Sequence, residues 1–358
     1  MPPGKIGASG GMESNLTGGS AEDGAGDAAP PMRERLIHAR LLTLLILIRL
    51  SAELGYRRQL GLVELHRRLI ALIGNYGALT SVELVALSGQ EKAQISRAVK
   101  ALCGRGLIER PSLRARIGLS ESGRAAFDAI IAVAQDRNAT LTAGITPDRL
   151  DRFMATTARL TERAALLLAG ERQLSAAAGE QPAEERDEAS GFLEPPPRPR
   201  IARPPDPARP MGQMVTPPLI TLAAYLQRSA TIAYRRETDL SNFAWQVLSQ
   251  IGEHAPITLS RLIAIIARDK SQVGRTVRRL EQSGMAERLK VRGRRDILLQ
   301  PTAAGEEVYR RMCVDALRRD DFLSAECAQG ERDAYIAAIE TMTANASALL
   351  GNERDRAA

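Results

Sequence analysis

Two stretches of this chain have closely similar sequences: TSVELVALSGQEKAQISRAVKALCGRGLIER at Thr80–Arg110 and TLSRLIAIIARDKSQVGRTVRRLEQSGMAER at Thr258–Arg288. They align without a gap at an offset of 178 residues (258 − 80), and 11 of the 31 aligned pairs are identical. A repeat of this length indicates a domain that occurs twice rather than a solenoid unit. We call the two stretches the first copy and the second copy.

Each copy has the sequence pattern of two short helices followed by a β-hairpin. Thr80 and Thr258 have the side chain and position of helix N-caps. The expected elements are helices at 81–87 and 92–104 with strands at 107–110 and 117–119 in the first copy, and helices at 259–267 and 270–283 with strands at 285–288 and 297–299 in the second. This order, in which a basic loop joins the two strands, predicts a winged helix-turn-helix.

Longer helices are expected on both sides of each copy. The segment 33–58 is apolar on most sides, so more than its own small domain must cover it, and 219–236 matches it at the same offset. Final helices are expected from Thr146 in the first half of the chain and over 331–350 in the second. We therefore predict a mostly α fold with small β-wings, in which tandem winged helix-turn-helix domains form an intramolecular pseudo-dimer through their N- and C-terminal helices.

Composition divides the chain into four parts. The N-terminal residues are rich in Gly, Ala and Pro, and a second stretch before residue 213 is rich in Glu and then in Pro. The predicted boundaries are a disordered tail at 1–31, a first winged-helix domain at 32–170, a Pro-rich linker at 171–213 and a second winged-helix domain at 214–352.

Charge and cysteine content restrict the class of protein. The chain has 358 residues and a formal net charge of +7. Its three cysteines, Cys103, Cys313 and Cys327, are too few and too scattered for a disulfide framework, which favours a reducing cytoplasm.

The apolar run Leu41–Ile48 is far shorter than the roughly 20 residues of a membrane span. No phosphate-binding loop, nucleophile–base pair or metal-ligand spacing is present, so we expect neither an enzyme nor a cofactor or metal site.

The second helix of each copy separates apolar from polar residues. Ile95, Val99 and Leu102, and likewise Val273, Val277 and Leu280, have the spacing of a buried face. An α-helix fits the major groove of B-DNA, where Arg and Gln contact base edges and Lys and Ser contact phosphates. The residues left for such a face are Lys92, Gln94, Ser96, Arg97 and Lys100 in the first copy, and Lys270, Ser271, Gln272, Arg275, Arg278 and Arg279 in the second.

The local charge around both helices supports this hypothesis. Residues 90–116 contain seven Lys or Arg against two Asp or Glu, and residues 268–295 contain ten against three. A single basic helix is more often an ordinary solvated surface. Two aligned copies, each followed by a basic hairpin, favour DNA binding.

These motifs resemble the MarR family of bacterial winged-helix transcription regulators. The shared pattern is Thr-x3-Leu, then Lys-x-Gln-x2-Arg-x-Val-x2-Leu, then Gly-[Leu/Met]-[Ile/Ala]-Glu-Arg, a basic wing and [Ser/Thr]-x2-Gly. Members are homodimers joined through their first and last helices, with one DNA-reading helix for each half-site. The resemblance implies that one chain here supplies both lobes, with the two basic helices facing the same way about one turn of DNA apart.

The two wings differ in length and charge. From Arg110 to Gly123 is 13 residues, whereas from Arg288 to Gly305 is 17. The basic wing residues are Arg114 and Arg116 in the first copy, and Arg292, Arg294 and Arg295 in the second. The second set is closer to the family's Arg-containing wing tip, so we expect the second lobe to bind DNA more tightly and the pseudo-palindromic operator to have unequal half-sites.

The resemblance also implies a small aromatic or anionic effector. In family members such ligands occupy the space between the first helix, the following helix and the DNA-reading unit. The residues expected near that space are Tyr56, Arg57, His66, Tyr234, Arg235 and Trp245. Trp245, which aligns with Arg67, is equally consistent with an ordinary core residue.

The sequence thus predicts a cytoplasmic, sequence-specific regulator of transcription that binds double-stranded DNA, and a repressor relieved by its effector. It would act as a monomeric pseudo-dimer or as a dimer of that unit, with no membrane partner. An alternative is a protein-interaction module derived from a regulator, in which one or both lobes no longer bind DNA; the short first wing is its best support.

Overall fold

The structure is a computed structural model that describes residues 35–88, 90, 92–112, 115–177, 213–238, 240–266, 269–289, 297–328 and 330–356. We call residues 35–177 the first half and residues 213–356 the second half. The expected tail, residues 1–31, lies outside the described residues. Among the helices of the described ranges, none is both long and apolar enough to cross a membrane.

The two halves contain the same succession of helices around a small sheet. The first half runs α2 (Ile37–Leu60), α3 (Glu64–Tyr76), α4 (Ser81–Ser88), α5 (Lys92–Gly104), β1 (Ile108–Glu109), β2 (Gly118–Leu119), α6 (Glu121–Leu141) and α7 (Pro147–Ala177). The second half runs α8 (Thr216–Thr238), α9 (Asn242–His254), β3 (Ile257–Thr258), α10 (Leu259–Ile266), α11 (Lys270–Gln282), β4 (Ala286–Leu289), β5 (Leu298–Pro301), α12 (Ala303–Ser324) and α13 (Glu331–Asp355). The predicted mostly α fold with small β-wings is confirmed.

The sheets of the two halves differ in one strand. In the first half β1 pairs antiparallel with β2, with Ile108 opposite Leu119. In the second half the strand order is β3-β5-β4, and Ile257 of β3 lies opposite Leu299. Strand β3 was not expected from the sequence. Its counterpart in the first half is reduced to a single antiparallel bridge between Leu79 and Ile117.

A glycine in each half fixes the wing against the helix that follows it. A Cβ atom on Gly123 would lie 1.8 Å from the carbonyl oxygen of Leu107, and one on Gly305 would lie 1.8 Å from that of Met285. Any side chain at these positions would therefore displace the backbone. This contact gives a physical reason for the [Ser/Thr]-x2-Gly motif in both copies.

Buried apolar residues form separate cores for the two winged helix-turn-helix units and a third core between the halves. The first-half unit is built around Leu69, Leu84 and Val99, and its counterpart around Leu248 and Val277. The third core joins the halves through buried residues of α2, α7, α8, α12 and α13, among them Leu41, Phe153, Leu222, Leu323 and Ile339. Burial of these side chains is the main force that holds the halves together.

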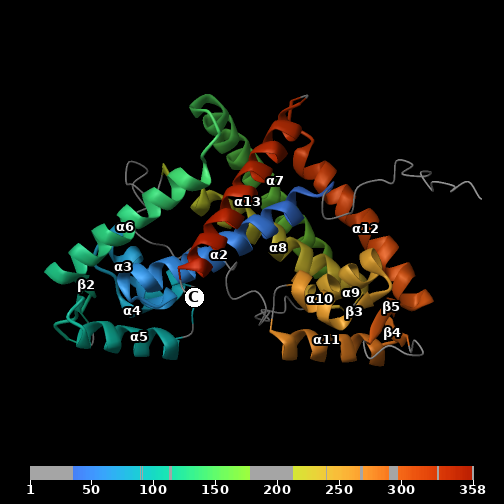
Figure 1. Cartoon of the computed structure of the whole chain (residues 1–358), viewed down its shortest axis with the longest axis horizontal. Coiled ribbons are helices and arrows are strands. Elements are labelled where there is room, and N and C mark those ends of the chain that lie inside the picture. Colours follow the sequence, from blue (N-terminus) through green and yellow to red (C-terminus); the bar gives the residue numbers. More distant parts are fainter. Residues whose placement is uncertain are drawn as a thin grey trace, which may run out of the picture.

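The last helix of each half packs on the first helix of the other. Helix α7 lies along α8, and α13 lies along α2, at the centre of a molecule with a triangular outline (Figure 1). Helices α6 and α12 form the sloping outer sides of the triangle. This reciprocal exchange explains why α2 is apolar on most of its surface: it is covered from several directions.

Contacts between equivalent residues reveal a local two-fold relation between the halves. Beyond the wings the offset becomes 182, because the second wing is four residues longer. Phe153 and Tyr335 are equivalent at this offset (335 − 153), and their rings stack with centroids 4.5 Å apart. Equivalent residues can touch each other only close to a two-fold axis.

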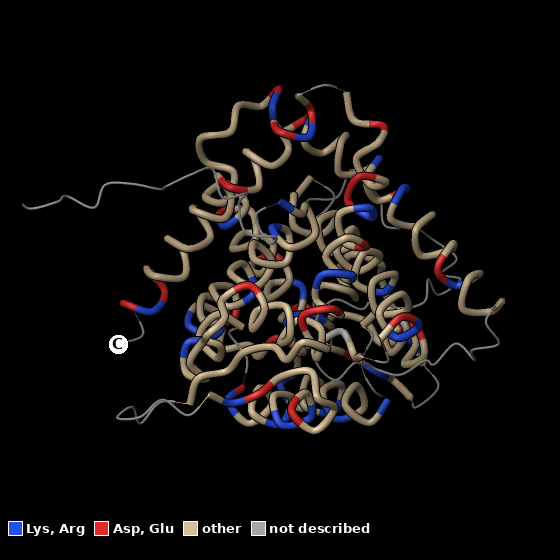
Figure 2. Tube along the Cα trace, turned by 90° about the vertical axis from the view of Figure 1, so that its right-hand side faces the viewer, with Lys and Arg blue, Asp and Glu red and all other residues tan. Residues whose placement is uncertain are grey.

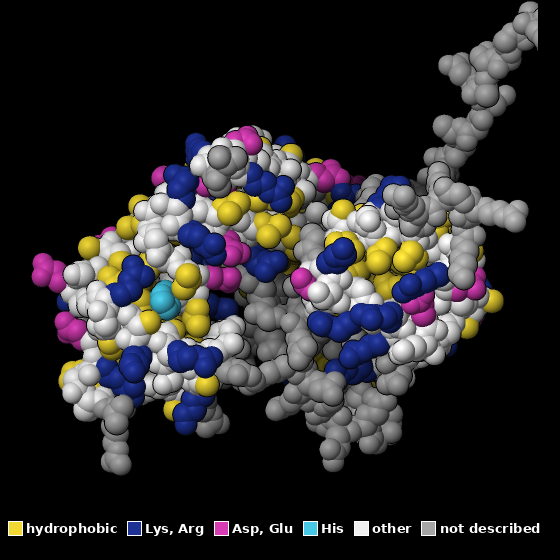
Figure 3. Space-filling view, turned by 60° about the horizontal axis from the view of Figure 1, so that its bottom comes forward, with side chains coloured by type: hydrophobic (Ala, Val, Ile, Leu, Met, Phe, Trp, Pro, Cys, Tyr) yellow, Lys and Arg dark blue, Asp and Glu magenta, His cyan; other side chains and the backbone are white. Residues whose placement is uncertain are grey.

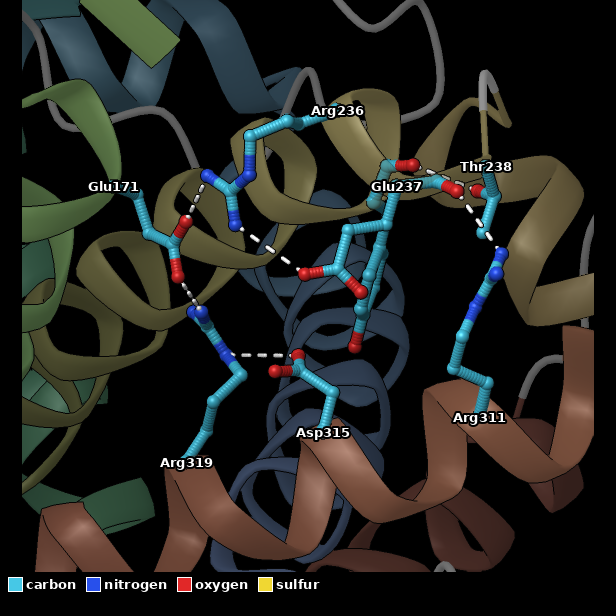
Figure 4. A network of polar contacts seen from close by, with 8 residues as sticks. Glu171, Arg236, Glu237, Thr238, Arg311, Asp315 and Arg319 are labelled. Atoms are coloured by element: carbon cyan, nitrogen blue, oxygen red, sulfur yellow. Dashed lines mark hydrogen bonds and ion pairs between the residues drawn. The ribbon is translucent and has the colours of Figure 1, made fainter. Parts of the chain in front are cut away.

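The ends of the exchanged helices carry matched polar contacts. Both carboxylate oxygens of Glu353 on α13 accept hydrogen bonds from Arg58 on α2, at 3.1 and 3.0 Å. At the equivalent place in the second half, Glu171 on α7 accepts a 2.6 Å hydrogen bond from Arg236 on α8 (Figure 4). Each half is therefore tied to the other by an Arg–Glu pair as well as by apolar packing.

The last helix of the first half extends past Glu171, the expected first residue of the linker. Helix α7 continues to Ala177, because Glu171 and Ser175 are buried against the second half. The chain is helical again from Thr216, where Pro217 is tolerated because the first turn of a helix has no partner for its N–H. Residues 178–212 lie outside the described residues. The other domain boundaries stay predictions.

Candidate nucleic-acid interface

The two basic helices have the predicted division into buried and surface residues. On α5, Ile95, Val99 and Leu102 are buried, and on α11 the buried residues include Val273 and Val277. Their apolar faces pack against the cores of their own units, so the polar faces are left on the surface. The spacing of apolar residues alone correctly indicated the face that each helix presents.

Local hydrogen bonds fix where these helices and their neighbours begin. Thr80 and Glu83 cap each other at the start of α4, since the Glu83 N–H donates to Thr80 Oγ1 and the Thr80 N–H donates to Glu83 Oε2. Thr258 Oγ1 accepts from the Arg261 N–H near the start of α10. Asp269 Oδ1 accepts from the N–H groups of Ser271 and Gln272, at 2.9 and 3.1 Å. The last contact sets the first turn of α11.

The predicted contact residues of both helices lie at the surface of the same edge of the molecule. Helices α5 and α11 run along the lower edge in Figure 1, one in each half. The exposed members of the predicted set are Lys92, Ser96, Arg97, Lys100, Lys270, Ser271, Arg275, Arg278 and Arg279, and Gln94 and Gln272 are half-buried. Figure 3 shows Lys and Arg side chains on both halves of this face, and Figure 2 marks Lys and Arg positions along the lowest layer of the backbone.

The wings contribute less described charge than the helices. Arg116 of the first wing is half exposed, but it donates to both carboxylate oxygens of Glu83, at 2.9 and 3.1 Å, and so is held toward α4. Four other predicted wing residues lie outside the described residues: Arg114, Arg292, Arg294 and Arg295. Among the described parts of the interface, the cations of α5 and α11 are therefore the best placed to contact an anionic polymer.

Comparison with known proteins places this geometry in a family. A model of the MarR family matches residues 240–292, from the loop before α9 into the second wing. A solved structure described as MarR is 30% identical to this chain, and the match covers 30% of this chain and 80% of that one, with a TM-score of 0.27. The chain belongs to the MarR family.

Two further solved structures are similar to part of this chain. A MarR/EmrR family transcriptional regulator from Acinetobacter sp. ADP1 is 25% identical, with 31% of this chain and 80% of that chain covered and a TM-score of 0.29. The PcaV transcriptional regulator from Streptomyces coelicolor, solved with its natural ligand, is 20% identical, with coverage of 38% and 94% and a TM-score of 0.31. Comparison with curated proteins gives no match. The match to the family model and the order of helices and wings together identify the fold of a MarR-family regulator.

A pocket of about 200 Å³ lies beside the first winged helix-turn-helix unit of this MarR-family protein, lined by residues of α2 and α3 among others. Its walls come from α2, α3 and α6 of the first half and from the start of α8 and the end of α13 in the second. The predicted effector residues Tyr56 and Arg57 line it. His66 is not among the lining residues; burial and the charge of Arg105 lower the pKa of its imidazole.

The corresponding region of the second half is packed differently. The ring of Tyr234 lies 5.5 Å from that of Trp245, which in turn lies 6.2 Å from that of Tyr309 (centroid distances). Burial raises the pKa of Tyr234 to about 12, so its hydroxyl is un-ionised. Arg235 is half-buried on the same helix as Tyr234. The structure therefore brings Tyr234 and Trp245 together as packed aromatic residues.

Three arginines that line the pocket, Arg49, Arg67 and Arg137, were absent from the predicted effector residues. Arg67 stacks over the Tyr56 ring, with its guanidinium carbon 4.3 Å from the ring centroid, and Arg137 reaches the pocket from α6. The alignment of Arg67 with Trp245 was a usable signal, because an arginine replaced by the chain's single tryptophan marks a difference between the copies. No comparable local signal marks Arg137. No cluster of three or more potential metal ligands occurs within the described ranges.

Proposed function

We propose that this protein is a sequence-specific regulator of transcription in which a single chain presents both recognition helices to one double-stranded operator. The observation that carries the proposal is that α5 and α11, from opposite halves, expose Lys and Arg along one edge of the molecule. One chain would thus perform the role of a two-chain dimer. A cytoplasmic location belongs to the same proposal, since the target is duplex DNA.

The roles of individual residues follow from their chemistry. Arg97 and Arg275, with Gln94 and Gln272 beside them, would hydrogen-bond base edges in successive major grooves. The lysines, serines and remaining arginines of the two helices would neutralise or hydrogen-bond phosphates. Arg116 would contribute little until it leaves Glu83, so the first lobe would bind its half-site less tightly than the second.

Repression would result from occupation of a promoter by this complex. An effector in the pocket between α2, α3, α6, α8 and α13 would relieve repression by changing the relative placement of the recognition helices. The walls of the pocket support this coupling, because they come from both halves of the chain. Such a ligand acts only to the extent that it binds one placement more tightly than the other.

Selection of bound sequences from a random pool of duplexes tests the proposal, followed by anisotropy titrations of the selected site at several salt concentrations. We expect one enriched sequence with unequal half-sites, and log affinity that falls with log salt by about 0.9 per phosphate neutralised. Absence of an enriched sequence would overturn the proposal and would favour the interaction module instead. Equal protection and equal salt sensitivity of the two half-sites in a footprint would overturn the inequality alone.

A further inference from the structure

The two halves carry opposite charges at one position beside their recognition helices. Glu83 lies in the first turn of α4, and at the offset of 178 its counterpart in the first turn of α10 is Arg261. The residues before them differ in the same direction, since Val82 is 78% exposed and its counterpart is an exposed serine, Ser260. An apolar residue and an acid in the first half thus correspond to a hydroxyl group and a cation in the second.

Two local contacts occupy the acid of the first half. Glu83 Oε2 accepts hydrogen bonds from the N–H and the hydroxyl of Thr80, at 2.7 and 2.9 Å, and both of its carboxylate oxygens accept from Arg116 at the base of the wing. The Thr80 N–H, and after it Arg116, lower the pKa of the Glu83 carboxyl against the opposite effect of burial. The acid is therefore ionised at neutral pH, and it holds Arg116 against α4.

The second half is built differently at this place. Arg116 corresponds to Leu298 at the offset of 182, and Leu298 is buried in β5 opposite Thr258 of β3. Strand pairing therefore joins this wing to the start of α10, where the first half has a single bridge and the ion pair. The side chain of Arg261 is exposed, and among the described residues it has no hydrogen bond or ion pair. Its charge is therefore available to an external anion.

The surroundings of Arg261 indicate which part of a duplex it would meet. Helix α10 leads into the recognition helix α11, and β3, directly before α10, pairs with β5 of the wing. Arg261 therefore lies between the recognition helix and the base of the wing, and the wings are on the outer flanks of the two halves (Figure 1). When the second helix of such a motif occupies a major groove, the first helix crosses the sugar–phosphate backbone. The anion opposite this position is then a phosphate.

We propose that Arg261, with Ser260 beside it, binds a phosphate on the outer side of the second half-site, and that Glu83 removes the equivalent contact from the first lobe. The formal charge at this position changes from −1 to +1 between the halves. Glu83 repels the phosphate and also keeps Arg116 away from it. This role rests on the proposed function and deepens it, because one pair of aligned residues then accounts for part of the unequal affinity of the two lobes.

Ethylation interference with the full chain and the selected operator tests the contact, because ethylation of a bound phosphate removes its charge and blocks binding. The half-site of the second lobe is the one whose sequence preference Arg275→Ala relaxes. We expect a blocking phosphate on the outer side of that half-site and none at the equivalent place in the other. Arg261→Ala should lose this block and should lower the slope of log affinity against log salt by about one. Arg149→Ala removes the same charge from an exposed position at the opposite edge of the molecule, so this matched control should behave as the unaltered chain.

Glu83→Gln tests the first lobe. The amide oxygen can still accept from the Thr80 N–H, so α4 keeps its cap, while the negative charge is lost and Arg116 is released. We expect tighter binding, a salt slope steeper by about one, and a new blocking phosphate on the outer side of the first half-site. Circular dichroism melting establishes that the variants fold. Glu83→Arg is the second variant, since the second half shows that a helix with Thr258 at its cap accepts an arginine three residues later.

Three results would overturn the proposal: an unchanged salt slope in folded Arg261→Ala, an unchanged set of blocking phosphates in that variant, or folded Glu83→Gln that binds the operator no more tightly than the unaltered chain. Each of them is observed only if the unaltered chain binds the operator, so each contradicts the roles of Arg261 and Glu83 and leaves the proposed function intact. A chain that binds no duplex contradicts the proposed function itself, and the phosphate contact with it.

Discussion

Arg275 lies on the exposed face of α11, and its side chain can reach a base pair only if that helix enters the major groove. We expect Arg275→Ala to weaken operator binding by about 1–3 kcal/mol and to relax the sequence preference at one position. Arg97→Ala should have the same kind of effect but a smaller one, because we propose that the first lobe binds its half-site less tightly. Anisotropy titrations against the operator and single-base variants measure both quantities.

A suitable control is Arg149→Ala, an exposed arginine in the first turn of α7. The connection between α6 and α7 lies at the upper edge of Figure 1, opposite α5 and α11. This variant should keep its affinity and its sequence preference. If Arg275→Ala behaved in the same way as the control, Arg275 would have no role in base recognition.

His38 gives a prediction about pH. Burial and the charge of Arg319 lower its pKa to about 4, against a smaller opposite effect of the Gln227 side chain. The unfolded chain therefore takes up this proton near pH 6.5, whereas the folded chain does not, so the free energy of unfolding falls as pH drops below 6.5. Between pH 7 and pH 5 we expect His38 to account for a loss of about 2 kcal/mol.

Replacement of His38 by the residue of the other half isolates this effect. His38→Thr copies Thr216, and the same carboxylates titrate in both proteins, so their contributions cancel in the comparison. Urea unfolding at pH 7 and pH 5 should show a smaller loss of stability for the variant. An equal loss in the two proteins would mean that His38 titrates normally in the folded state.

At the scale of single residues, the sequence predicted the buried faces of α5 and α11, because the spacing of Ile95, Val99 and their counterparts is a local property. It did not predict the partners of the buried arginines. Arg137 finds Ser51 across 86 residues, and Arg319 finds Glu171 across 148. Such pairs exist only after the exchanged helices have met, and no local pattern encodes them.

At the scale of single elements, the start of α11 depends on Asp269. Its carboxylate accepts two backbone N–H groups that would otherwise lack partners. We expect Asp269→Ala to lower the free energy of unfolding by about 0.5–2 kcal/mol. Asp269→Asn retains an acceptor at the cap and should lose less. Urea unfolding of the three proteins measures the difference, and equal stability of Asp269→Ala and the unaltered chain would refute the role of this cap.

Most element boundaries could be predicted because their signals are local. Apolar spacing and N-cap residues placed α5 at its observed bounds and gave α11 to within one residue of its end. Two elements could not be predicted in this way. Strand β3 is two residues long and exists through its pairing with β5, and the last turns of α7 are stabilised by burial of Glu171 and Ser175 against the other half.

For the whole molecule, the tether between the lobes predicts the behaviour of the complex on dilution. Because both recognition helices belong to one chain, the effective concentration of each lobe near the other is high. We expect one chain to bind one operator, and the stoichiometry to stay the same at concentrations where a separate-chain dimer would dissociate. Sedimentation of the complex across a dilution series measures this ratio. Two chains per operator would indicate instead a dimer of pseudo-dimers.

The exchange of last helices also constrains how the protein is made. The apolar surface of α2 is covered by α13, and Arg58 of α2 meets its partner Glu353 only 295 residues later. At roughly 5–20 residues per second, a ribosome needs on the order of 15–60 seconds to deliver that partner. During this interval the apolar surface of α2 in the nascent first half is exposed to solvent. Folding of this fused chain therefore requires that the apolar surface of α2 be shielded until α13 has been synthesised. Two separate chains would instead cover such a surface by dimerising after their release from the ribosome.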